Sequence, residues 1–289
     1  MSPARRRPGG PGSEVAAGRR PPLAAITLDF GNTLVPVDRA ALDAVVGALA
    51  DAAESTFRVD RAGFLAAWRE ERARQFREEV PRFRETDLAT RLRRVLARLR
   101  GVVAPASEEA WDDGRAAACS TEAEIGAGLD VYSRAFVTGI PPDPAVGLLL
   151  ARLAPRYRLA ILSNWPLAVT IDLYAEAAGW APHLVSIVVS ERVGAIKPHA
   201  AIFRAAEAAL AVPGGPPLDP GSILHVGDDW AADVVGATAA GWRAAYLRGR
   251  PEDSPLPGSE PAGDAVADLV LDRLVDLEPA LAALRSSPG

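Results

Sequence analysis

Lys197 is the only lysine in a chain of 289 residues that holds 32 lysine and arginine residues in all. In so arginine-rich a sequence, a lone lysine suggests a task for a compact point charge on a flexible stem rather than for a planar guanidinium. It lies in the segment 193–199, where Gly194 and Pro198 indicate a turn after an apolar run. A codon bias against lysine is the simpler alternative. We take Lys197 as the first functional candidate.

Three aspartates also follow apolar runs. Asp29 comes directly after residues 23–28, and Asp228 follows residues 222–226, with Asp233 five positions further on. Carboxylate oxygens are hard ligands that suit Mg²⁺, and a carboxylate can also attack an electrophilic centre as a nucleophile. Each aspartate alone could be a turn or helix-cap residue. Their shared position after apolar runs favours a common site.

Five short apolar runs alternate with segments of helical periodicity. Because continuous apolar strands that alternate with helices are typical of a parallel sheet covered on both faces, we predict a Rossmann-like, doubly wound α/β core. Ligands of such sheets bind at the carboxyl ends of the strands. All the polar clusters follow strand-like runs, so they should meet at that edge. The runs span residues 23–28, 158–162, 184–189, 222–226 and 243–247.

A helical segment of about a hundred residues interrupts the core after its first strand. Residues 38–140 show helical periodicity and almost no strand signal, so we predict an all-helical cap domain there. Residues 23–37 and 141–289 then form the catalytic core. A cap over the site would exclude water and carry selectivity, whereas the alternative is a bundle that only stabilises the fold. The predicted cap helices span residues 40–53, 61–77, 86–100 and 121–136.

Composition narrows the function classes. The net charge of −5 argues against nucleic acid or a membrane surface as the main partner. No apolar run approaches the roughly 18 residues of a membrane span. The single cysteine, Cys119, excludes an intrachain disulfide and fits the reducing cytoplasm. Residues 1–22 lack the apolar segment of a secretory signal, and we expect a disordered N-terminal arm there.

Four motifs in this order resemble those of the haloacid dehalogenase superfamily of phosphotransferases and hydrolases. In chain order, the first motif is Asp29-x-Gly31-Asn32-Thr33, the second is Ser163-Asn164, and the third is Lys197-Pro198. The fourth is Gly227-Asp228-Asp229 followed by Asp233. The helical insertion between the first two motifs is similar to the helical cap type of that superfamily.

The resemblance implies a role for each motif residue. Asp29 would be the nucleophile, and Mg²⁺ would be bound by Asp29, Asp228, Asp233 and the backbone carbonyl of Gly31. Ser163 and Lys197 would hold the phosphoryl group, with Thr33 and Asn164 also binding substrate. The implied activity is a Mg²⁺-dependent phosphatase that acts on a small soluble metabolite through an aspartyl-phosphate.

Gly31 departs from the pattern of the phosphatases in this superfamily. Most carry a second aspartate there, which protonates the leaving group and then activates water, a contribution of roughly 10²–10⁴ in rate. The substrate could have a good leaving group, or another acid could substitute, such as Asp38, His199 or an acid of the cap. The third alternative is a catalytically inactive member of the superfamily that binds a phosphorylated ligand or a protein.

A metal-independent haloacid dehalogenase is the alternative within the same class, because dehalogenases also lack that second aspartate. Their fourth motif resembles Ser-x-Asn-x-x-Asp, however, so the acidic pair Asp228 and Asp233 favours Mg²⁺ and phosphate. Phosphonate cleavage in this superfamily needs a lysine in the cap. The only lysine, Lys197, belongs to the core, which excludes that branch.

An arginine-rich stretch of the predicted cap is interleaved with glutamates. Such a pattern is more typical of a solvated, salt-bridged helix face than of an anion site. One of these arginines that faced the cleft could still hold a second anionic group of the substrate. The stretch comprises Arg69, Arg72, Arg74, Arg77, Arg82 and Arg84.

Overall fold

The computed structural model describes residues 20–106 and 109–286. Of the N-terminal arm that we predicted to be disordered, residues 1–19 lie outside the described residues. Residues 20–22 contact the core, since Arg20 Nη1 donates to Asp268 Oδ1 at 2.5 Å and the carbonyl of Pro21 accepts a hydrogen bond from Arg243. These residues therefore lie against the core.

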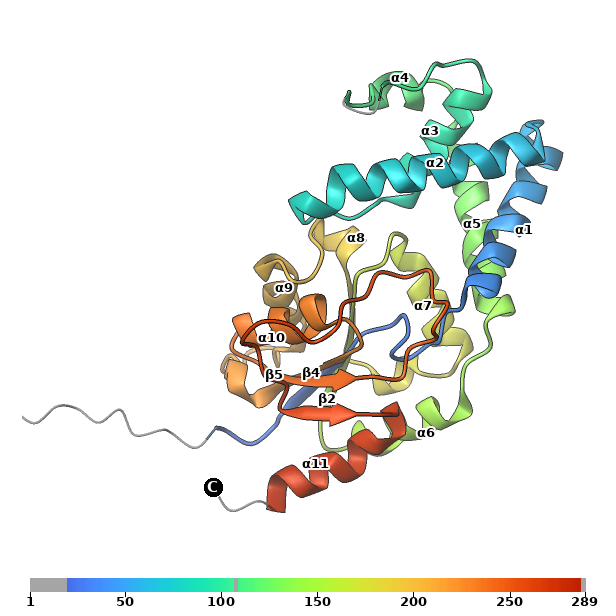
Figure 1. The fold of residues 1–289 in the computed structure, drawn as a ribbon. Helices are drawn as coiled ribbons and strands as arrows, with labels where there is room; N and C mark the ends of the chain where they lie inside the picture. The colour runs from blue at the N-terminus through green and yellow to red at the C-terminus, as the bar shows by residue number, and fades with distance from the viewer. Residues whose placement is uncertain (1–19, 107–108, 287–289) are drawn as a thin grey trace, which may run out of the picture.

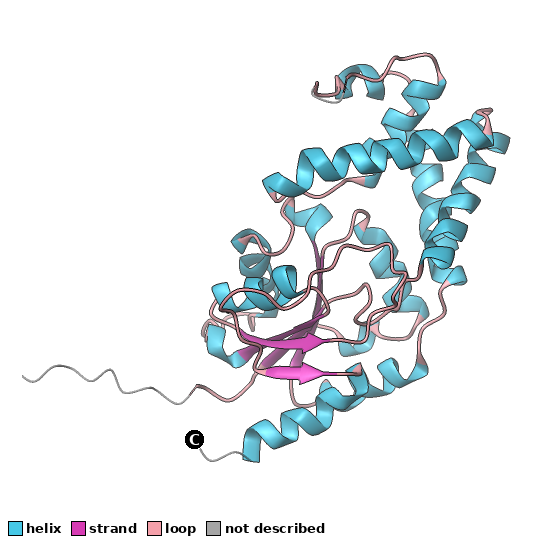
Figure 2. Cartoon of the chain, in the orientation of Figure 1, coloured by secondary structure: helices cyan, strands magenta, loops and turns pink. Residues whose placement is uncertain are grey.

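A six-stranded parallel sheet forms the centre of the molecule (Figure 2), in the order β3-β2-β1-β4-β5-β6. This confirms the predicted Rossmann-like α/β class. The third strand begins two residues later than predicted, at Ser186. The strands are β1 (Ala25–Leu28), β2 (Arg158–Ser163), β3 (Ser186–Val189), β4 (Ile223–Gly227), β5 (Arg243–Leu247) and β6 (Leu269–Leu271).

Alternate residues of each strand face opposite sides of the sheet, as the pleat requires. Ile26 and Leu28 of β1 belong to one hydrophobic cluster, which also includes side chains of α6, α7 and α11, whereas Ala25 belongs to a second cluster with α9 and α10. Burial on both sides explains why the strands are continuously apolar. These helices are α6 (Pro144–Leu153), α7 (Ala168–Ala177), α9 (Ala200–Leu210), α10 (Gly236–Ala239) and α11 (Leu277–Ser286).

Short elements complete the core. A four-residue helix, α8 (Ser190–Val193), follows β3, and a π-helical turn, η4 (Trp230–Val235), follows the acidic motif after β4. The remaining short turns are 3₁₀-helical. They are η2 (Ala181–His183), η3 (Pro220–Ser222) and η5 (Leu274–Asp276).

The register of the strands brings the polar motifs to one edge. Leu28 of β1 lies opposite Ile161 of β2 on one side and Val226 of β4 on the other. Because these three strands are parallel and aligned, Asp29 and the residues that end β2 and β4 lie at the same edge of the sheet. Strand pairing thus gathers motifs that are about 200 residues apart in the chain.

Helices α1 to α5 lie on the carboxyl side of this sheet, with α2 extending across the upper part of the molecule, below α4, in Figure 1. Helix α1 packs against α5, and α2 packs against α3. Aspartates or a threonine cap the starts of these helices, as Asp38 does for α1 by accepting from Ala41 N at 2.7 Å. The elements are α1 (Arg39–Phe57), α2 (Arg61–Glu79), η1 (Val80–Arg82), α3 (Leu88–Leu99), α4 (Asp113–Ala117) and α5 (Glu122–Gly139).

Several backbone and side-chain contacts fix these helices to the core. Leu88 N donates to the carbonyl of Pro166 at 3.1 Å, and Ile196 N donates to the carbonyl of Phe83 at 3.0 Å. Helix α5 also packs along α7. The connection between α2 and α3 therefore lies near the sheet edge that carries the polar motifs. None of the helices in the described ranges is long and apolar enough to cross a membrane.

Candidate active site

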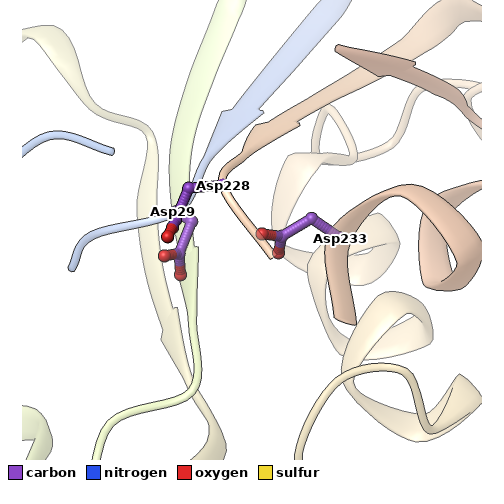
Figure 3. A group of neighbouring side chains, drawn as sticks. All are labelled: Asp29, Asp228 and Asp233. Atoms are coloured by element: carbon purple, nitrogen blue, oxygen red, sulfur yellow. The ribbon is translucent and has the colours of Figure 1, made fainter. Parts of the chain in front are cut away.

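Three buried carboxylates converge at the carboxyl edge of the sheet. Figure 3 shows Asp29 and Asp228, from the ends of the adjacent strands β1 and β4, facing Asp233 from η4. One carboxylate oxygen from each lies within 4.8 Å of the other two. The three residues are between 2% and 9% exposed. Like charges this close and this buried repel strongly, so the group needs a cation.

Lys197 supplies one such cation. Its ammonium group donates to Asp29 Oδ1 at 2.8 Å, to Asp233 Oδ1 at 2.7 Å and to the carbonyl of Leu162 at 3.0 Å. All three N–H donors of the ammonium are therefore used. A guanidinium could not reproduce this compact, three-way arrangement, which gives the lone lysine a physical reason.

The side chain of Asn164 holds the turn that carries Lys197. Its Oδ1 accepts from Lys197 N at 2.7 Å, and its Nδ2 donates to the Lys197 carbonyl at 3.1 Å. Asn164 lines the cavity described below, but these two bonds give it a positioning task. Ser163 is the last residue of β2 and is buried, at 1% exposure.

Asp233 has further partners that sequence reasoning missed. His225 Nε2 lies 2.9 Å from Asp233 Oδ1, and His225 Nδ1 lies 2.8 Å from Thr27 Oγ1. The backbone N–H of Asp229 donates to Asp233 Oδ2 at 2.9 Å. A histidine in an apolar strand does not by itself indicate its partner, which here is eight positions away across a turn.

Gly227 makes room for this arrangement. A Cβ at position 227 would lie 2.1 Å from Asp233 Oδ2, so any side chain there would displace the carboxylate. The glycine of the fourth motif is therefore required by close approach rather than by an unusual backbone angle.

The electrostatic balance differs among the charged groups. Although burial lowers the pKa of Lys197, Asp233 and Asp29 raise it above its usual value, which keeps the ammonium charged. Burial raises the pKa of Asp29 despite the opposing effect of Lys197. Burial also acts to raise the pKa of Asp233, but Lys197 and His225 hold it below its usual value. Asp233 therefore stays negatively charged within the group.

Asp228 is the least compensated of the three carboxylates. Burial, together with Asp29 and Asp233, raises its pKa to about 8. Its contacts are long: Asn32 Nδ2 and Thr33 Oγ1 each lie 3.4 Å away, and Arg250 Nη1 lies 3.6 Å away. A divalent cation would relieve this repulsion, and hard carboxylate oxygens are the ligands Mg²⁺ prefers. The donor set therefore fits the implied metal.

Gly31 lies against apolar groups. A Cβ at this position would be 2.5 Å from Leu256 Cδ1 and 3.2 Å from Trp165 Cζ3. The place where a second acid would stand is thus occupied by Leu256, from the loop that joins β5 to β6. In the same loop, Ser254 Oγ accepts from Asn32 Nδ2 at 3.0 Å. The prolines and glycines of this stretch indicate a loop but not what it contacts.

The three groups considered as substitutes for the missing acid have different positions. Asp38 and His199 are exposed helix caps, of α1 and α9 respectively. The cap also offers Glu85, which lines the cavity. Burial raises the pKa of Glu85, and its Oε1 accepts from Thr86 N at 2.7 Å.

A cavity of about 660 Å³ lies between the core and the cap helices. Its core side holds the three aspartates and Lys197. Its cap side is formed mainly by apolar and aromatic side chains with several arginines. Trp165 lies between the two sides, packed edge-on against Phe30 and Phe136 with ring centroids 5.3 and 5.2 Å apart. The three aspartates and Lys197 thus form one wall of a cavity whose lining is of mixed polarity.

The haloacid dehalogenase-like hydrolase family model matches residues 23–241, which is most of the chain. The chain therefore belongs to this family. No protein of curated function matches it significantly in sequence.

Solved structures share the fold at low sequence identity. The 2-haloacid dehalogenase of Pseudomonas syringae pv. tomato is 21% identical over 91% of this chain and 100% of its own, with a TM-score of 0.65. The HAD hydrolase YfnB of Bacillus subtilis, bound to magnesium, is 18% identical over 90% and 99%, with a TM-score of 0.54. A HAD phosphatase of Thermococcus onnurineus is 16% identical over 90% and 98%, also at 0.54. The similar folds thus include both dehalogenases and phosphatases.

Proposed function

We propose that this hydrolase is a Mg²⁺-dependent phosphate monoester hydrolase that acts on a small soluble metabolite through an aspartyl-phosphate. The observation that carries the proposal is the group formed by Asp29, Asp228 and Asp233. One ammonium, Lys197, and a more distant guanidinium, Arg250, face three buried carboxylates. A divalent cation and a phosphoryl group together complete the charge balance of such a site.

Asp29 has the geometry of a nucleophile. Lys197 donates to its Oδ1, whereas its Oδ2 accepts no hydrogen bond within the described residues. In the first step Oδ2 forms a bond to phosphorus while the bond from phosphorus to the ester oxygen breaks, and the leaving alkoxide takes up a proton. In the second step water attacks phosphorus, inorganic phosphate leaves and the Asp29 carboxylate is regenerated.

The other motif residues position and stabilise. Asp29, Asp228, Asp233 and the Gly31 carbonyl would hold Mg²⁺, which when bound neutralises charge on the phosphoryl oxygens. With substrate bound, Lys197 would redirect one of its three N–H donors to a phosphoryl oxygen, which Ser163 would also hold. Asn164 would fix the turn that carries Lys197, and Thr33 would donate a hydrogen bond to Asp228.

The absence of an acid at Gly31 restricts the leaving group. A side chain there would contact Leu256 and Trp165, so the chain has apolar groups where a proton donor would stand. We therefore propose a substrate with a good leaving group, such as an acyl phosphate or an anomeric sugar phosphate. The lack of an acidic side chain at Gly31 also favours a metal-independent dehalogenase as the second candidate, in which Asp29 would displace halide from carbon.

Hydrolysis of para-nitrophenyl phosphate, acetyl phosphate and 2-chloropropionate, each with and without Mg²⁺, tests the proposal. We expect release of phosphate that requires Mg²⁺ and is lost in Asp29→Asn. Chloride release without metal would favour the dehalogenase. No turnover of any of the three by a chain that binds Mg²⁺ would favour a binding role.

A further inference from the structure

The two sides of the cavity carry opposite charge. On the core side, four aspartates, Asp229 among them, face Lys197. The cap side of the lining holds five arginines and two acids, Asp43 and Glu85. The arginines are Arg39, Arg61, Arg69, Arg72 and Arg91. A cavity with a positive wall opposite the reaction centre is suited to a ligand that is anionic at both ends.

Arg91 is the most buried of these arginines, at 4% exposure. Its Nε donates to Gln75 Oε1 at 2.8 Å, and its Nη2 donates to Thr86 Oγ1 at 3.1 Å. Neutral groups thus fix the guanidinium in place. Within the described part of the chain, no carboxylate pairs with it and no acceptor bonds its Nη1. A buried guanidinium without an anionic partner is costly, and this one lines the cavity.

Arg72 lies beside it on α2. Its Nη2 donates to the carbonyl of Pro255 at 2.9 Å, and its guanidinium stacks over Phe76, 4.7 Å from the ring centroid. Its Nε and Nη1 have no acceptor among the described residues. Two fixed guanidinium groups with free N–H donors match the fork geometry by which arginine binds carboxylate or phosphate.

The two charges act on one another and on Tyr132. Burial lowers the pKa of Arg91 to about 10, and the charge of Arg72 also acts to lower it. Burial raises the pKa of Tyr132 to about 12, although Arg91 and Arg72 act to lower it. The phenol therefore stays protonated and offers a third donor on the same wall of the cavity. An anion in contact with these groups would relieve the repulsion between the two arginines.

The nearby acidic side chains do not supply the anion that would pair with Arg72 and Arg91. Glu85 interacts with Arg91 electrostatically, but its oxygens bond Thr86 and Ser190. Asp87 also lies near Arg91 and caps α3 by accepting from Thr90 N at 2.6 Å. Both carboxylates are therefore engaged elsewhere.

We propose that Arg72, Arg91 and Tyr132 form a subsite for a second oxyanion, so that the substrate is a phosphate monoester with a carboxylate or second phosphate at its far end. The inference deepens the proposed function and rests on it for the phosphoryl end. The apolar and aromatic lining between the ends, which includes Leu65, Trp68 and Trp165, fits an apolar or ring-shaped body. The cap residues thus select the substrate by charge at a distance from the reacting phosphorus.

Binding measurements test the subsite without depending on turnover. The probes are phenyl phosphate, para-carboxyphenyl phosphate and hydroquinone bisphosphate. Their dissociation constants are measured by titration calorimetry with Mg²⁺ in the Asp29→Asn chain, which cannot form the covalent intermediate. We expect at least one of the two doubly anionic probes to bind about tenfold or more tightly than phenyl phosphate, the gain for a charge-assisted pair. The probe that gains affinity shows whether the subsite prefers a carboxylate or a phosphate.

Substitutions on α2 and α3 then locate the subsite. We expect Arg72→Gln to reduce the affinity ratio to about twofold or less, and Arg72→Lys to retain part of it. Arg91→Lys should also reduce the ratio, with circular dichroism to check that this buried variant folds. Arg77→Gln is the matched control, because Arg77 is exposed on the same helix and does not line the cavity.

Two results would overturn the subsite. One is equal binding of all three probes, or no binding of any, by the chain with Arg72 and Arg91 intact. The other is a preference that survives both Arg72→Gln and Arg91→Lys. Failure of the proposed function is a separate result: the wild-type chain would release no phosphate from para-nitrophenyl or acetyl phosphate, whatever the affinity ratio.

Discussion

At the scale of single residues, the site is a compact network in which charge and close approach decide the residue types. Lys197 joins Asp29 and Asp233, and Gly227 allows Asp233 to come near the strand end. The lone lysine, the three aspartates and the glycines could be identified from the sequence, because each follows an apolar run. His225 and Arg250 could not, because nothing local in the sequence indicates which distant carboxylate they meet.

Replacement of Lys197 by arginine should reduce kcat/KM by at least about tenfold, because a misplaced charge at a reaction centre is costly. The planar guanidinium cannot donate to Asp29, Asp233 and the Leu162 carbonyl from one point. Steady-state kinetics with para-nitrophenyl phosphate measures the effect. A variant with near-normal kcat/KM would mean that the lone lysine reflects composition only.

Substitution of Gly227 by alanine should destabilise the fold by about 2 kcal/mol, because the new Cβ would overlap the Asp233 carboxylate. Urea denaturation gives the free energy of unfolding. Gly126→Ala is the control, since a Cβ on this exposed residue of α5 would meet nothing within 4 Å. It should stabilise by about 0.5–1 kcal/mol through helix propensity. Equal effects of the two substitutions would contradict the close-approach argument.

Mg²⁺ should raise the melting temperature more at about pH 8.5 than at about pH 6. The pKa of Asp228 is raised to about 8 in the fold, so its protonated form stabilises the metal-free protein. That contribution is fully present below about pH 4 and is lost as the pH rises through about 8. Mg²⁺ then replaces the proton as the neutralising group. Thermal unfolding at both pH values measures the difference, and an equal rise at both would contradict it.

At the scale of elements, strand pairing and one loop build the site. The apolar runs predicted β1 to β5, and helical periodicity predicted α1, α2, α3 and α5 approximately. The loop between β5 and β6 was different. Ser254 and Leu256 reach Asn32 and Gly31 across more than 200 residues. Because such contacts depend on how the chain returns over the sheet, proline and glycine content indicated a loop without showing what it covers.

This loop leads to a prediction about leaving groups. With Leu256 against Gly31, position 31 supplies no acid to the leaving oxygen, so kcat/KM should fall steeply as the leaving group becomes more basic. We expect phenyl phosphate to react at least about 100-fold more slowly than para-nitrophenyl phosphate, the scale of lost acid catalysis. A series of substituted aryl phosphates measures the slope.

Variants at the same contact provide the control. Gly31→Asp combined with Leu256→Gly should flatten the slope, because the new carboxyl group would have both the position and the space of a proton donor. Leu256→Gly alone should keep the slope steep. A shallow slope in the wild-type chain would show that another acid, such as Glu85, already protonates the leaving group.

At the scale of the whole molecule, the helical segment faces the sheet edge across one cavity, with negative charge on the core wall and positive charge on the cap wall. The sequence predicted the fold class and the sheet edge where the site lies. It left open which of the arginines between positions 69 and 84 face inward. Arg69 and Arg72 line the cavity, Arg72 beside Arg91 because α2 packs along α3. Arg74 instead pairs with Glu78, and Arg84 pairs with Glu79.

The central claim is that Asp29 attacks phosphorus. The most direct measurement incubates the chain with acetyl phosphate and Mg²⁺, quenches with acid, reduces with borohydride and analyses the peptide that contains Asp29 by mass spectrometry. An aspartyl-phosphate is reduced to homoserine, so we predict homoserine at position 29 and none in samples without Mg²⁺. Release of phosphate with aspartate intact at position 29 would contradict it.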